Sequence, residues 1–520
     1  MFGFIAAFLP WVLYWILVGN TTYLVAVSVA FGVAVVLEIV EFARDRRIGS
    51  LEIGSLVFFA LSFVSAFLID DAVIEQWLQP LSNGALFLIA LVGVLVGHPF
   101  VRSAAARTVD AVTAASDGFR YITTAMTWMW VGVFGVMTAS SLIPPIVDGA
   151  ATIRDAGDAL SIVCYWVVPF ALFGLAGAVS AAFPGWFDRS MTRLHEAERA
   201  GDGEPEAGPT TASGGGAPVD VAGMPGLLLL PEGDAPAGGW PAVACFGGSE
   251  GGVDSMRGTA ALLARNGLVV LVTAWTDADA EGRPAIERIP LERFGTAIDW
   301  LRARPESGAV AALAISRGAE GLLASAAAGL ARPDAIVALS PSSVRWQAIG
   351  DDGEVPGTGS WSAGGVEAGW LAVRAGELVP QLVRNAWRVT RRHPAGAEPL
   401  RLRAAYESAL AQARSAERAA GAIDATAIAA PALFAAGEAD AIWPGGPMAT
   451  ELASMRRRDD DRLLVIPAAG HLLLPGLSPD QAAEHGGIAM GGTAEGNAAV
   501  ERELWPAILA FLSERLPSRH

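Results

Sequence analysis

The sequence predicts two kinds of fold in one chain, an α-helical membrane domain followed by an α/β domain with a mostly parallel sheet. The chain has 520 residues, of which 52% are hydrophobic and only 17% are charged. Its mean hydropathy of +0.42 is too high for an ordinary soluble protein. Long apolar segments fill the first third, and short apolar runs alternate with helical patterns afterwards. We therefore expect a membrane domain over 1–190, a linker over 191–219 and an α/β domain over 220–520.

Composition also excludes several kinds of partner. The net charge of −17 argues against nucleic acid, because a nucleic-acid-binding protein needs a basic face. The two cysteines, Cys164 and Cys245, lie in apolar runs, so we interpret them as buried hydrophobic residues and expect no disulfide framework. Neither a metal-binding cluster nor a dinucleotide fingerprint occurs in the sequence. We therefore expect no metal and no cofactor.

Six apolar stretches are predicted to be transmembrane helices. A helix needs roughly 17–25 mostly apolar residues to cross the hydrocarbon core of a bilayer. The stretches cover residues 2–18, 22–41, 53–69, 84–101, 121–143 and 159–183. We therefore expect about six spans, with the lipid bilayer as a partner.

The charges between these stretches predict their orientation. Arginines follow the second, fourth and sixth stretches, namely Arg44, Arg46, Arg47, Arg102, Arg107, Arg189 and Arg193. Acidic residues dominate after the third and fifth, namely Asp70, Asp71, Glu75, Asp148, Asp155 and Asp158. Because arginine-rich loops remain in the cytoplasm, we expect a multi-pass inner (plasma) membrane protein. Both termini and the C-terminal domain would then be cytoplasmic.

The composition changes after the last apolar stretch. Residues 196–218 are polar and rich in glycine and proline, which is typical of a flexible linker. Short apolar runs follow at 227–231, 241–247, 268–275, 309–316, 335–341, 431–437 and 462–468. Helical patterns such as MRGTAALLARNG separate several of them. Strands that are apolar throughout and alternate with helices predict a parallel sheet covered on both faces.

Three polar residues directly follow three of the predicted strands: Ser316, Asp440 and His471. In such sheets the reacting groups gather at the carboxyl ends of the strands. Ser316 also begins a helical pattern, and Ala314 and Gly318 are small enough for a sharp strand-to-helix turn, although Ala314 replaces the glycine of G-x-S-x-G. The order Ser, Asp, His is that of α/β-hydrolases. We therefore predict a catalytic triad in which His471 deprotonates Ser316 and Asp440 orients the imidazole.

A second serine, Ser249, lies in GGSEG, which matches G-x-S-x-G literally. It follows an earlier strand, in a stretch with too many glycines to begin a rigid helix. We interpret this stretch as a loop whose backbone N–H groups near Gly248 and Ser249 form an oxyanion hole with the N–H of Arg317. His393 and His485 are rival bases, but neither follows a strand, so a solvated surface role is favoured for both.

Several motifs of the C-terminal domain occur together in a known family. They are RIPLERFGTAIDWLRARP, AISRGAEG, ALSPSSVRWQ, GEADAIWP, AAGHLLLP and GGTAEGNAAVERELWPAILAFL. With them, residues 220–515 resemble the catalytic domain of the acyl-CoA thioesterase and bile acid-CoA:amino acid N-acyltransferase family, apart from an insert. The resemblance implies an α/β-hydrolase fold and a serine or cysteine nucleophile with Asp and His, at Ser316, Asp440 and His471. It also implies cleavage of acyl-CoA thioesters, or transfer of the acyl group to an amine.

The chain departs from this family in two places. The family's usual N-terminal β-sandwich is absent, and the region between ALSPSS and PALFAAG is longer and more basic. We expect that region to be a helical insert over about 350–428. Its segment PQLVRNAWRVTRRH, residues 380–393, predicts a basic amphipathic helix with four arginines at helical spacing beside Trp387, namely Arg384, Arg388, Arg391 and Arg392.

Three interpretations of this basic helix remain open. The helix could lie on the anionic leaflet of the membrane. The arginines and Trp387 could bind a substrate by holding the phosphates of a CoA-type group. The helix could also be a solvated cap element whose apolar side packs on the domain.

The function expected from these patterns is a membrane-anchored serine hydrolase that acts on acyl thioesters or acyl esters. A serine nucleophile favours hydrolysis, because water readily attacks a serine acyl-enzyme. One alternative is an acyltransferase with an amine or hydroxyl acceptor. Another is a membrane transport or scaffold protein whose hydrolase-like domain is not catalytic.

Overall fold

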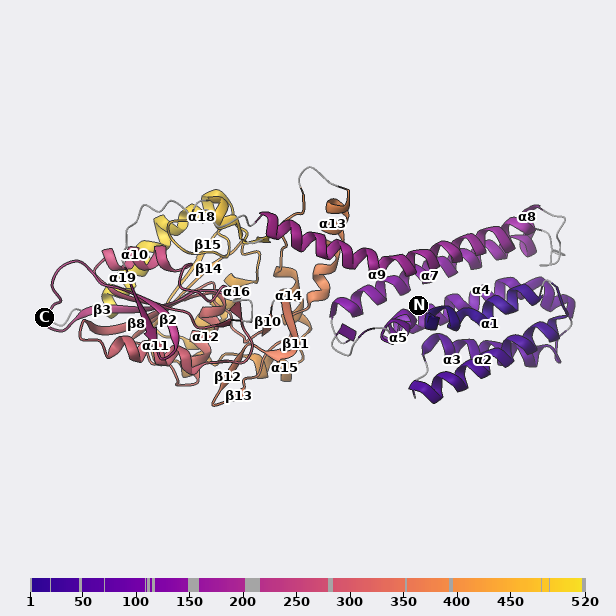
Figure 1. The fold of residues 1–520 in the computed structure, drawn as a ribbon, viewed down its shortest axis with the longest axis horizontal. Helices are drawn as coiled ribbons and strands as arrows, with labels where there is room; N and C mark the ends of the chain where they lie inside the picture. Colours follow the sequence, from indigo (N-terminus) through magenta and orange to yellow (C-terminus); the bar gives the residue numbers. More distant parts are fainter. Residues whose placement is uncertain are drawn as a thin grey trace. The chain divides into compact units, whose positions relative to one another are not determined.

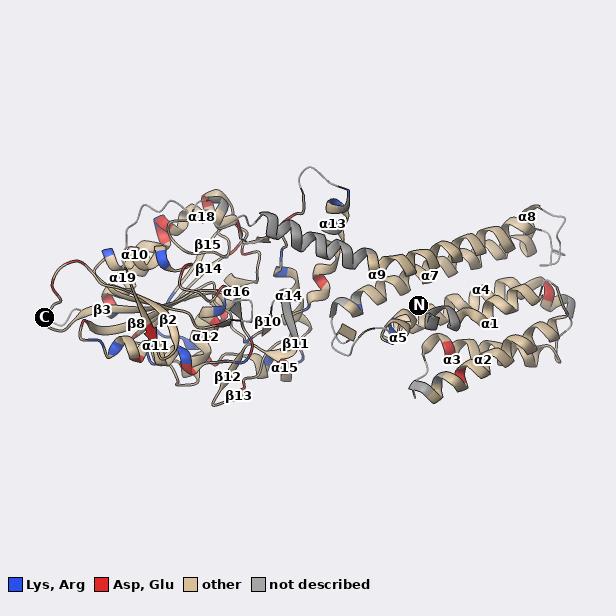
Figure 2. Ribbon diagram, viewed as in Figure 1, with Lys and Arg blue, Asp and Glu red and all other residues tan. Residues whose placement is uncertain are grey.

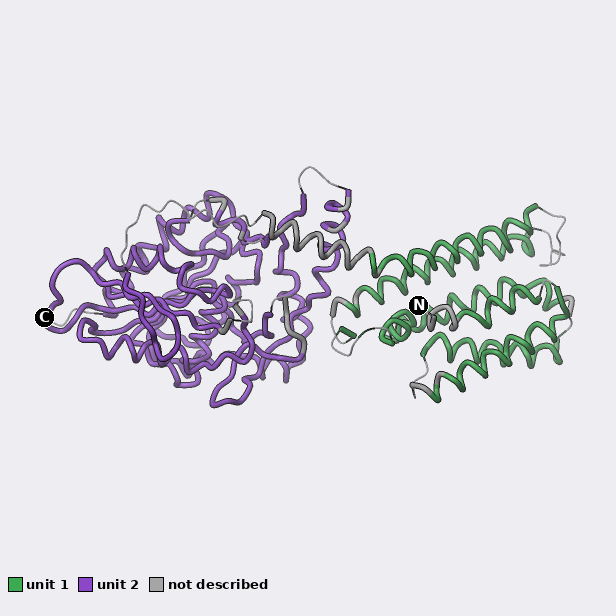
Figure 3. Tube along the Cα trace, viewed as in Figure 1, with its two compact units in different colours: residues 1–192 green, residues 193–520 purple. Residues whose placement is uncertain are grey.

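The computed structural model divides into two compact units, residues 1–192 and 193–520 (Figure 3). The first unit is helical and the second contains the sheet (Figure 1). The described residues are 2–18, 20–45, 49–69, 71–107, 109, 113–114, 117–147, 159–201, 216–278, 284–350, 353–391, 396–477, 479–485 and 487–516.

The helices of the first unit follow the apolar stretches of the sequence. They are α1 (Phe2–Val18), α2 (Tyr23–Asp45), α3 (Ser50–Ser65), α4 (Asp71–Leu95), α5 (Phe100–Ala105), α7 (Asp117–Val147), α8 (Ala159–Ile162), the π-helix η1 (Val163–Val167) and α9 (Val168–Gly201). Among the described residues, four segments are long and apolar enough to cross a membrane: Tyr23–Val40, Val73–Leu95, Ile122–Val147 and Ala159–Phe183. Two shorter apolar segments, Phe8–Val18 and Ser50–Ser65, coincide with the remaining predicted spans. The four long segments suggest a membrane protein.

The predicted fourth span, residues 84–101, is misplaced. Helix α4 begins at Asp71 and ends at Leu95, so Asp71 belongs to a helix and not to a loop. Polar residues interrupt the first half of α4, so a search for continuous runs of apolar residues misses it. Two of them, Gln79 and Asn83, are at most 2% exposed, and their amides donate to the backbone carbonyls of Tyr165 and Met137. Interhelical hydrogen bonds of this kind hold polar side chains inside a helical bundle.

Aromatic side chains fill the interior of this first unit. Trp11 and Trp15 are at most 2% exposed, and their indole N–H groups donate to the hydroxyls of Ser55 and Ser82. Large aliphatic side chains instead lie exposed along the helices, and charged residues are few there (Figure 2). An apolar exterior around an interior that contains hydrogen-bonded polar side chains is the arrangement that a lipid environment favours.

The predicted linker, residues 191–219, is also partly wrong. Helix α9 continues to Gly201, and strand β1 begins at Ala217. Residues 191–201 contain Leu, Glu, Ala and Arg, which favour a helix and extend the last apolar segment. Residues 202–215 lie outside the described residues.

The second unit is built on an eight-stranded sheet of order β1-β2-β4-β3-β8-β9-β14-β15. Its strands are β1 (Ala217–Val221), β2 (Met224–Leu229), β3 (Trp240–Phe246), β4 (Val269–Thr273), β8 (Ser307–Ile315), β9 (Ala335–Leu339), β14 (Ala432–Gly437) and β15 (Arg462–Ile466). Only the β1–β2 and β2–β4 pairs are antiparallel, and the others are parallel. The predicted mostly parallel sheet is therefore confirmed. Strand β1 was missed because it lies in the linker-like composition.

Helices cover both faces of this sheet (Figure 1). They are α10 (Arg257–Arg265), α11 (Glu292–Arg302), α12 (Ser316–Ala327), α16 (Gly445–Arg456), α17 (Pro479–Ala483), α18 (Ala494–Ala499), the π-helix η4 (Val500–Leu504) and α19 (Trp505–Arg515). One buried cluster joins the sheet to α11, α12 and α16, and a second joins the opposite face to α10 and α19. The sheet is thus buried on both faces, as its continuously apolar strands require.

The insert was predicted to be helical over about 350–428; in the structure its elements run over residues 347–427, and it is not wholly helical. It begins with β10 (Gln347–Gly350), β11 (Gly353–Gly359), β12 (Trp361–Ala363) and β13 (Val366–Glu367). The consecutive glycines Gly364 and Gly365 have φ of 56° and 77°, which a two-residue hairpin turn between β12 and β13 requires. Helical elements follow: η2 (Ala375–Leu378), α13 (Val379–Thr390), α14 (Arg403–Gln412), α15 (Ser415–Gly421) and η3 (Ala425–Ala427). Short strands elsewhere are β5 (Asp277–Ala278), β6 (Pro284–Ala285), β7 (Ile289–Pro290), β16 (Glu484–His485) and β17 (Ile488–Ala489).

Candidate active site

Ser316 lies at the sharp turn between β8 and α12. Ile315 is still extended, with φ −125° and ψ 146°, whereas Ser316 has φ +56° in the left-handed region. Non-glycine residues adopt that region only where the surrounding structure enforces it. Ala314, paired in the sheet with Phe246 and Ala338, is fully buried. The turn therefore forms although alanine replaces the expected glycine.

The structure brings the three predicted triad residues together. The Nε2 atom of His471 lies 2.8 Å from Oγ of Ser316. The Nδ1 atom of the same ring lies 2.7 Å from Oδ2 of Asp440. Exposed fractions are 9% for Ser316, 3% for His471 and 0% for Asp440. This is the hydrogen-bonded chain that a general base needs in order to take a proton from a serine and share the resulting charge with a carboxylate.

Hydrogen bonds to the backbone fix the loops that carry Asp440 and His471. The second carboxylate oxygen of Asp440 accepts the N–H groups of Ile442 at 2.7 Å and of Trp443 at 3.2 Å. The hydroxyl of Ser340, at the end of β9, donates to the carbonyl of His471 at 2.6 Å. These contacts explain why residues so far apart in sequence keep one geometry. Ser340 was not singled out from the sequence, because a serine at a strand end is common.

The predicted oxyanion loop approaches Ser316 but is engaged with its own side chain. A Cβ added to Gly248 would lie 3.5 Å from Cβ of Ser316, so the loop borders the nucleophile. However, the N–H of Gly248 donates to Oε1 of Glu250 at 2.7 Å. Ser249 is exposed. The Gly248 N–H is therefore bonded within its own loop, a contact that the sequence interpretation of this loop did not include.

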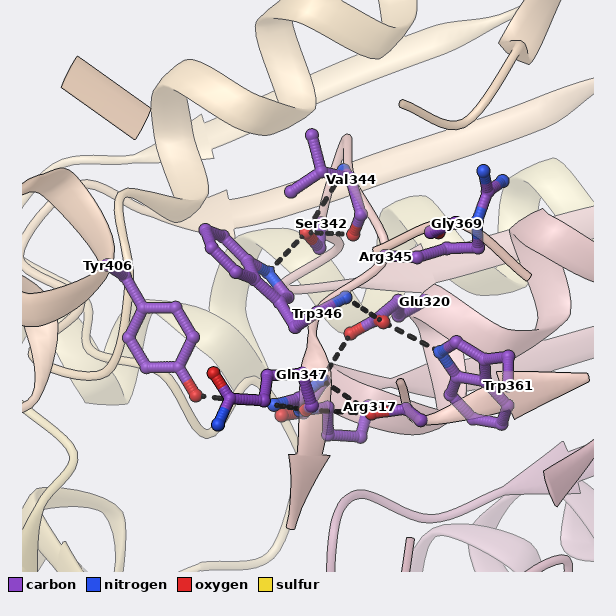
Figure 4. A network of polar contacts seen from close by, with 12 residues as sticks. Arg317, Glu320, Ser342, Val344, Arg345, Trp346, Gln347, Trp361, Gly369 and Tyr406 are labelled. Atoms are coloured by element: carbon purple, nitrogen blue, oxygen red, sulfur yellow. Dashed lines mark hydrogen bonds and ion pairs between the residues drawn. The ribbon is translucent and has the colours of Figure 1, made fainter. Parts of the chain in front are cut away.

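The side chain of Arg317 forms a buried polar network that the sequence analysis missed (Figure 4). Its guanidinium contacts Glu320 at 3.0 Å, and the two side chains are 2% and 0% exposed. Burial lowers the pKa of the Arg317 guanidinium. The charge of Glu320 and the hydrogen bonds to Glu320 and Tyr406 have the larger combined effect, so the pKa of Arg317 is raised overall. The available signal was an i,i+3 charge pair inside an otherwise small and apolar helix.

The arginines of the predicted basic helix are mostly paired within the insert. Arg388 bonds the carbonyl of Gly396 at 3.0 Å and forms an ion pair with Glu398. Arg384 lies 3.9 Å from the same carboxylate, and Arg391 stacks over the exposed ring of Trp387 at 5.2 Å. Arg392 lies outside the described residues. Glu398 therefore neutralises part of the charge that a substrate phosphate would use.

The rival bases and the cysteines do not join this site in the part of the chain that is described. His485 belongs to β16, and His393 lies outside the described residues. Both cysteines are free and buried, and burial raises the pKa of the Cys245 thiol, which makes it a poor nucleophile. No cluster of His, Cys, Asp and Glu suited to a metal ion occurs among the residues for which the structure gives positions.

A sequence family matches the end of the chain. The model of the family described as BAAT / Acyl-CoA thioester hydrolase C terminal matches residues 397–518. This segment contains Asp440 and His471, whereas Ser316 precedes it. No curated protein matches the chain.

Solved hydrolase structures match part of the chain at low sequence identity. A dienelactone hydrolase-like promiscuous phosphotriesterase from metagenomic libraries is 17% identical, with a TM-score of 0.34 over 58% of this chain and 98% of that chain. The α/β-hydrolase GrgF from Penicillium sp. sh18 is 14% identical, with a TM-score of 0.35 over 58% and 99%. A puromycin-hydrolyzing peptidase from Mycobacterium tuberculosis is 16% identical, with a TM-score of 0.34 over 58% and 40%.

The family match and the sheet together define the second unit. Its mostly parallel eight-stranded sheet, with helices on both faces, has a strand-to-helix turn that presents a serine. Residues 397–518 match a family of thioester hydrolases and acyltransferases. The second unit is thus an α/β-hydrolase-like domain, of the kind that forms enzymes.

Proposed function

We propose that this protein is a membrane-anchored serine hydrolase that cleaves acyl thioesters, such as acyl-CoA, or acyl esters. The observation that carries the proposal is the position of His471, which bridges Ser316 at 2.8 Å and Asp440 at 2.7 Å. A serine hydroxyl is a weak nucleophile unless an adjacent base takes its proton. This arrangement supplies both the base and the carboxylate that orients it.

The geometry supports a two-step acyl transfer to water. Oγ of Ser316 attacks the acyl carbonyl carbon while its proton passes to Nε2 of His471, and Asp440 stabilises the imidazolium. The carbonyl oxygen becomes an oxyanion, which the N–H groups of Arg317 and Gly248 hold once Glu250 has moved aside. The tetrahedral intermediate then expels the thiolate or alkoxide, which takes the proton from His471. Water attacks the acyl-enzyme in the same way and releases the acid and free Ser316.

The acyl substrate is proposed from the chemistry and from the family match. A triad of this kind acts on activated carbonyls, and the matched family is named for thioester hydrolysis. Transfer to an amine or hydroxyl acceptor needs the same acyl-enzyme, so an acyltransferase is the second candidate. Its support is the same family, whose name also includes an acyltransferase.

The basic helix α13 is proposed as a secondary binding element. Arg384, Arg388, Arg391, Arg392 and Trp387 would contact a phosphate-bearing substrate such as a CoA thioester. Replacing the four arginines with Gln tests this role. A raised KM for acyl-CoA with an unchanged KM for a p-nitrophenyl ester would support it, whereas equal KM values would leave only a structural role.

The membrane part of the proposal concerns about six spans with both termini in the cytoplasm. The four long apolar segments support a membrane location, and the arginines after alternate stretches support this orientation. Single cysteines placed at residues 2 and 519 test the orientation. Both should remain unlabelled by an impermeant maleimide in intact cells, and labelling of either one would overturn it.

Labelling with a fluorophosphonate probe tests the catalytic proposal. Full-length protein in detergent should be labelled, and the Ser316→Ala variant should not. Product analysis with acyl-CoA, with and without an amine acceptor, then separates free acid from a conjugate. If the wild-type protein is not labelled and forms neither product, the domain is a non-catalytic part of a membrane scaffold.

A further inference from the structure

The side chain of Arg317 connects the nucleophile turn to the insert. Its guanidinium donates to the carbonyl of Gln347 and the hydroxyl of Ser360, both at 3.2 Å, and lies 3.4 Å from the hydroxyl of Tyr406. These three partners belong to β10, to the residue before β12, and to α14, all within the insert. The residue next to the nucleophile is therefore held by a part of the chain that does not belong to the central sheet (Figure 4).

Glu320 keeps this guanidinium charged and in one place. One of its oxygens pairs with Arg317, and the other accepts the backbone N–H of Trp346 at 2.8 Å and the indole N–H of Trp361 at 2.6 Å. Burying two charges is costly unless the remaining polar positions are also bonded. Here the carboxylate accepts donors from Trp346, which directly precedes the insert, and from Trp361 within the insert, and it pairs with Arg317 of α12 on the other side. A fully bonded buried network of this kind specifies a single arrangement.

Tyr406 also leads to the catalytic histidine. Its ring packs edge-to-face on Trp443, with centroids 5.7 Å apart, and Trp443 packs edge-to-face on His471 at 5.2 Å. Tyr406 is 3% exposed and Trp443 is 1% exposed. On its other side, Tyr406 packs on Trp346 at 4.7 Å. One insert side chain thus contacts both the arginine beside Ser316 and the aromatic ring that supports His471.

We propose that Tyr406 is a positioning residue, through which the insert sets the geometry of the Ser316–His471 pair. This inference rests on the proposed hydrolase function. Tyr406 holds the nucleophile turn by its hydroxyl, through Arg317, and holds the imidazole by its ring, through Trp443. Proton transfer depends steeply on such positions, because a misplacement of about 1 Å can reduce a rate about a hundredfold.

Two substitutions separate the contributions of the hydroxyl and the ring. Tyr406→Phe removes only the hydroxyl that contacts Arg317, and Tyr406→Leu also removes the aromatic contact with Trp443. We expect kcat for a small p-nitrophenyl ester to fall about threefold in the Phe variant and about thirtyfold or more in the Leu variant. KM should stay within about twofold, because the side chain acts on the catalytic groups and not on the substrate. If the Tyr406→Phe variant keeps most of the kcat that Tyr406→Leu loses, the aromatic ring is the main support of the Ser316–His471 pair.

The second buried ion pair of this domain provides a matched control. The side chains of Arg456 and Asp461 lie 2.6 Å apart and are 1% and 6% exposed. The Arg456 guanidinium also donates to the backbone carbonyls of residues 425, 428 and 430. Asp461→Asn should lower the thermal unfolding midpoint without lowering kcat per folded molecule. Folded molecules are counted by size exclusion of the full chain in detergent, and the unfolding midpoint is measured for each variant.

The outcomes separate a wrong inference from a wrong function. An active wild-type protein with a Tyr406→Leu variant that keeps wild-type kcat per folded molecule would overturn the positioning role. The positioning role would also be overturned if Asp461→Asn, at an equal loss of stability, lost as much kcat as Tyr406→Leu does. If the wild-type protein neither hydrolyses the ester nor reacts with the fluorophosphonate, the proposed function itself has failed. If Tyr406→Leu does not fold, the kcat of the Tyr406→Phe variant decides, and a wild-type value would overturn the hydroxyl's role.

Discussion

The turn at residues 314–318 lies at the end of β8, and the loop at residues 247–251 follows β3, which is adjacent to β8 in the sheet. Each contains a serine with a glycine two positions after it, Gly318 in the first and Gly251 in the second. In the first, the strand passes directly into α12, and Ser316 is 9% exposed and bonded to His471. In the second, no helix begins until α10 at Arg257, and Ser249 is exposed. The literal G-x-S-x-G match therefore lies in a loop, and the imperfect match forms the strand-to-helix turn whose serine is bonded to His471.

The difference shows that the surroundings of the serine, more than the motif letters, decide its chemistry. A nucleophile needs a base within hydrogen-bonding reach and donors for the developing oxyanion. The two segments supply different parts of that requirement, and they pack against each other at their backbones. A Cβ added to Gly318 would overlap the carbonyl oxygen of Gly247. In the proposed mechanism the two segments therefore form one site, with the nucleophile in one and the oxyanion donor in the other.

The largest difference between the two segments should appear when each serine is removed. Ser316→Ala should lower kcat for a p-nitrophenyl ester by roughly 10⁴- to 10⁶-fold, as loss of a triad nucleophile does. Ser249→Ala should keep kcat within about threefold, because its hydroxyl takes no part in the reaction and its backbone N–H is retained. A reversed order of the two losses would show that the literal motif carries the nucleophile.

The backbone contact between the segments should be the next most sensitive feature. Gly318→Ala places a methyl group against the carbonyl of Gly247, and such overpacking costs about 1–3 kcal/mol of the free energy of unfolding. We expect kcat to fall about a hundredfold as well, because the two segments can no longer keep their spacing. Urea unfolding and steady-state kinetics measure the two effects.

A helical glycine away from the site serves as the control for that variant. Gly258 lies in α10 with open space where a Cβ would be added. Gly258→Ala should raise the free energy of unfolding by about 0.5–1 kcal/mol and leave kcat unchanged. If Gly318→Ala also behaves in this way, the close approach of the two segments has no importance for the reaction.

A smaller effect is expected when the Gly248 N–H is freed. Glu250→Ala removes the carboxylate that accepts this N–H. Displacing one hydrogen bond of this kind costs about 1 kcal/mol, so we expect kcat/KM to rise about fivefold. Glu250→Gln retains an oxygen acceptor, so its kcat/KM should lie between those of the wild-type protein and the Glu250→Ala variant. A fall in kcat/KM in the alanine variant would instead mean that Glu250 assists the reaction.

The smallest effect concerns the departure from the motif at Ala314. Ala314→Gly restores the motif but removes a buried methyl and adds backbone freedom in β8. We expect the free energy of unfolding to fall by about 1 kcal/mol and kcat to stay within about twofold. A large gain in kcat would show that the alanine distorts the nucleophile turn, against the geometry seen at Ser316.

Much of the second unit was predictable because it depends on local patterns. Continuous apolar runs identified seven of the eight strands of the main sheet, and positions just after three strands identified Ser316, Asp440 and His471. Errors arose where polar residues lie inside an element, as in the first half of α4. Others arose where an element has a linker-like composition, as in β1 and the hairpin at Gly364 and Gly365.

The sequence by itself determined the two kinds of fold, the parallel sheet and the order of the three polar residues, because strand and helix periods are properties of neighbouring residues. Only the tertiary structure decided what those residues meet. The approach of Nε2 of His471 to Ser316 and the link from Arg317 through Tyr406 to Trp443 join segments far apart in the chain. Such contacts depend on how complete elements pack, and no local pattern in the sequence specifies them.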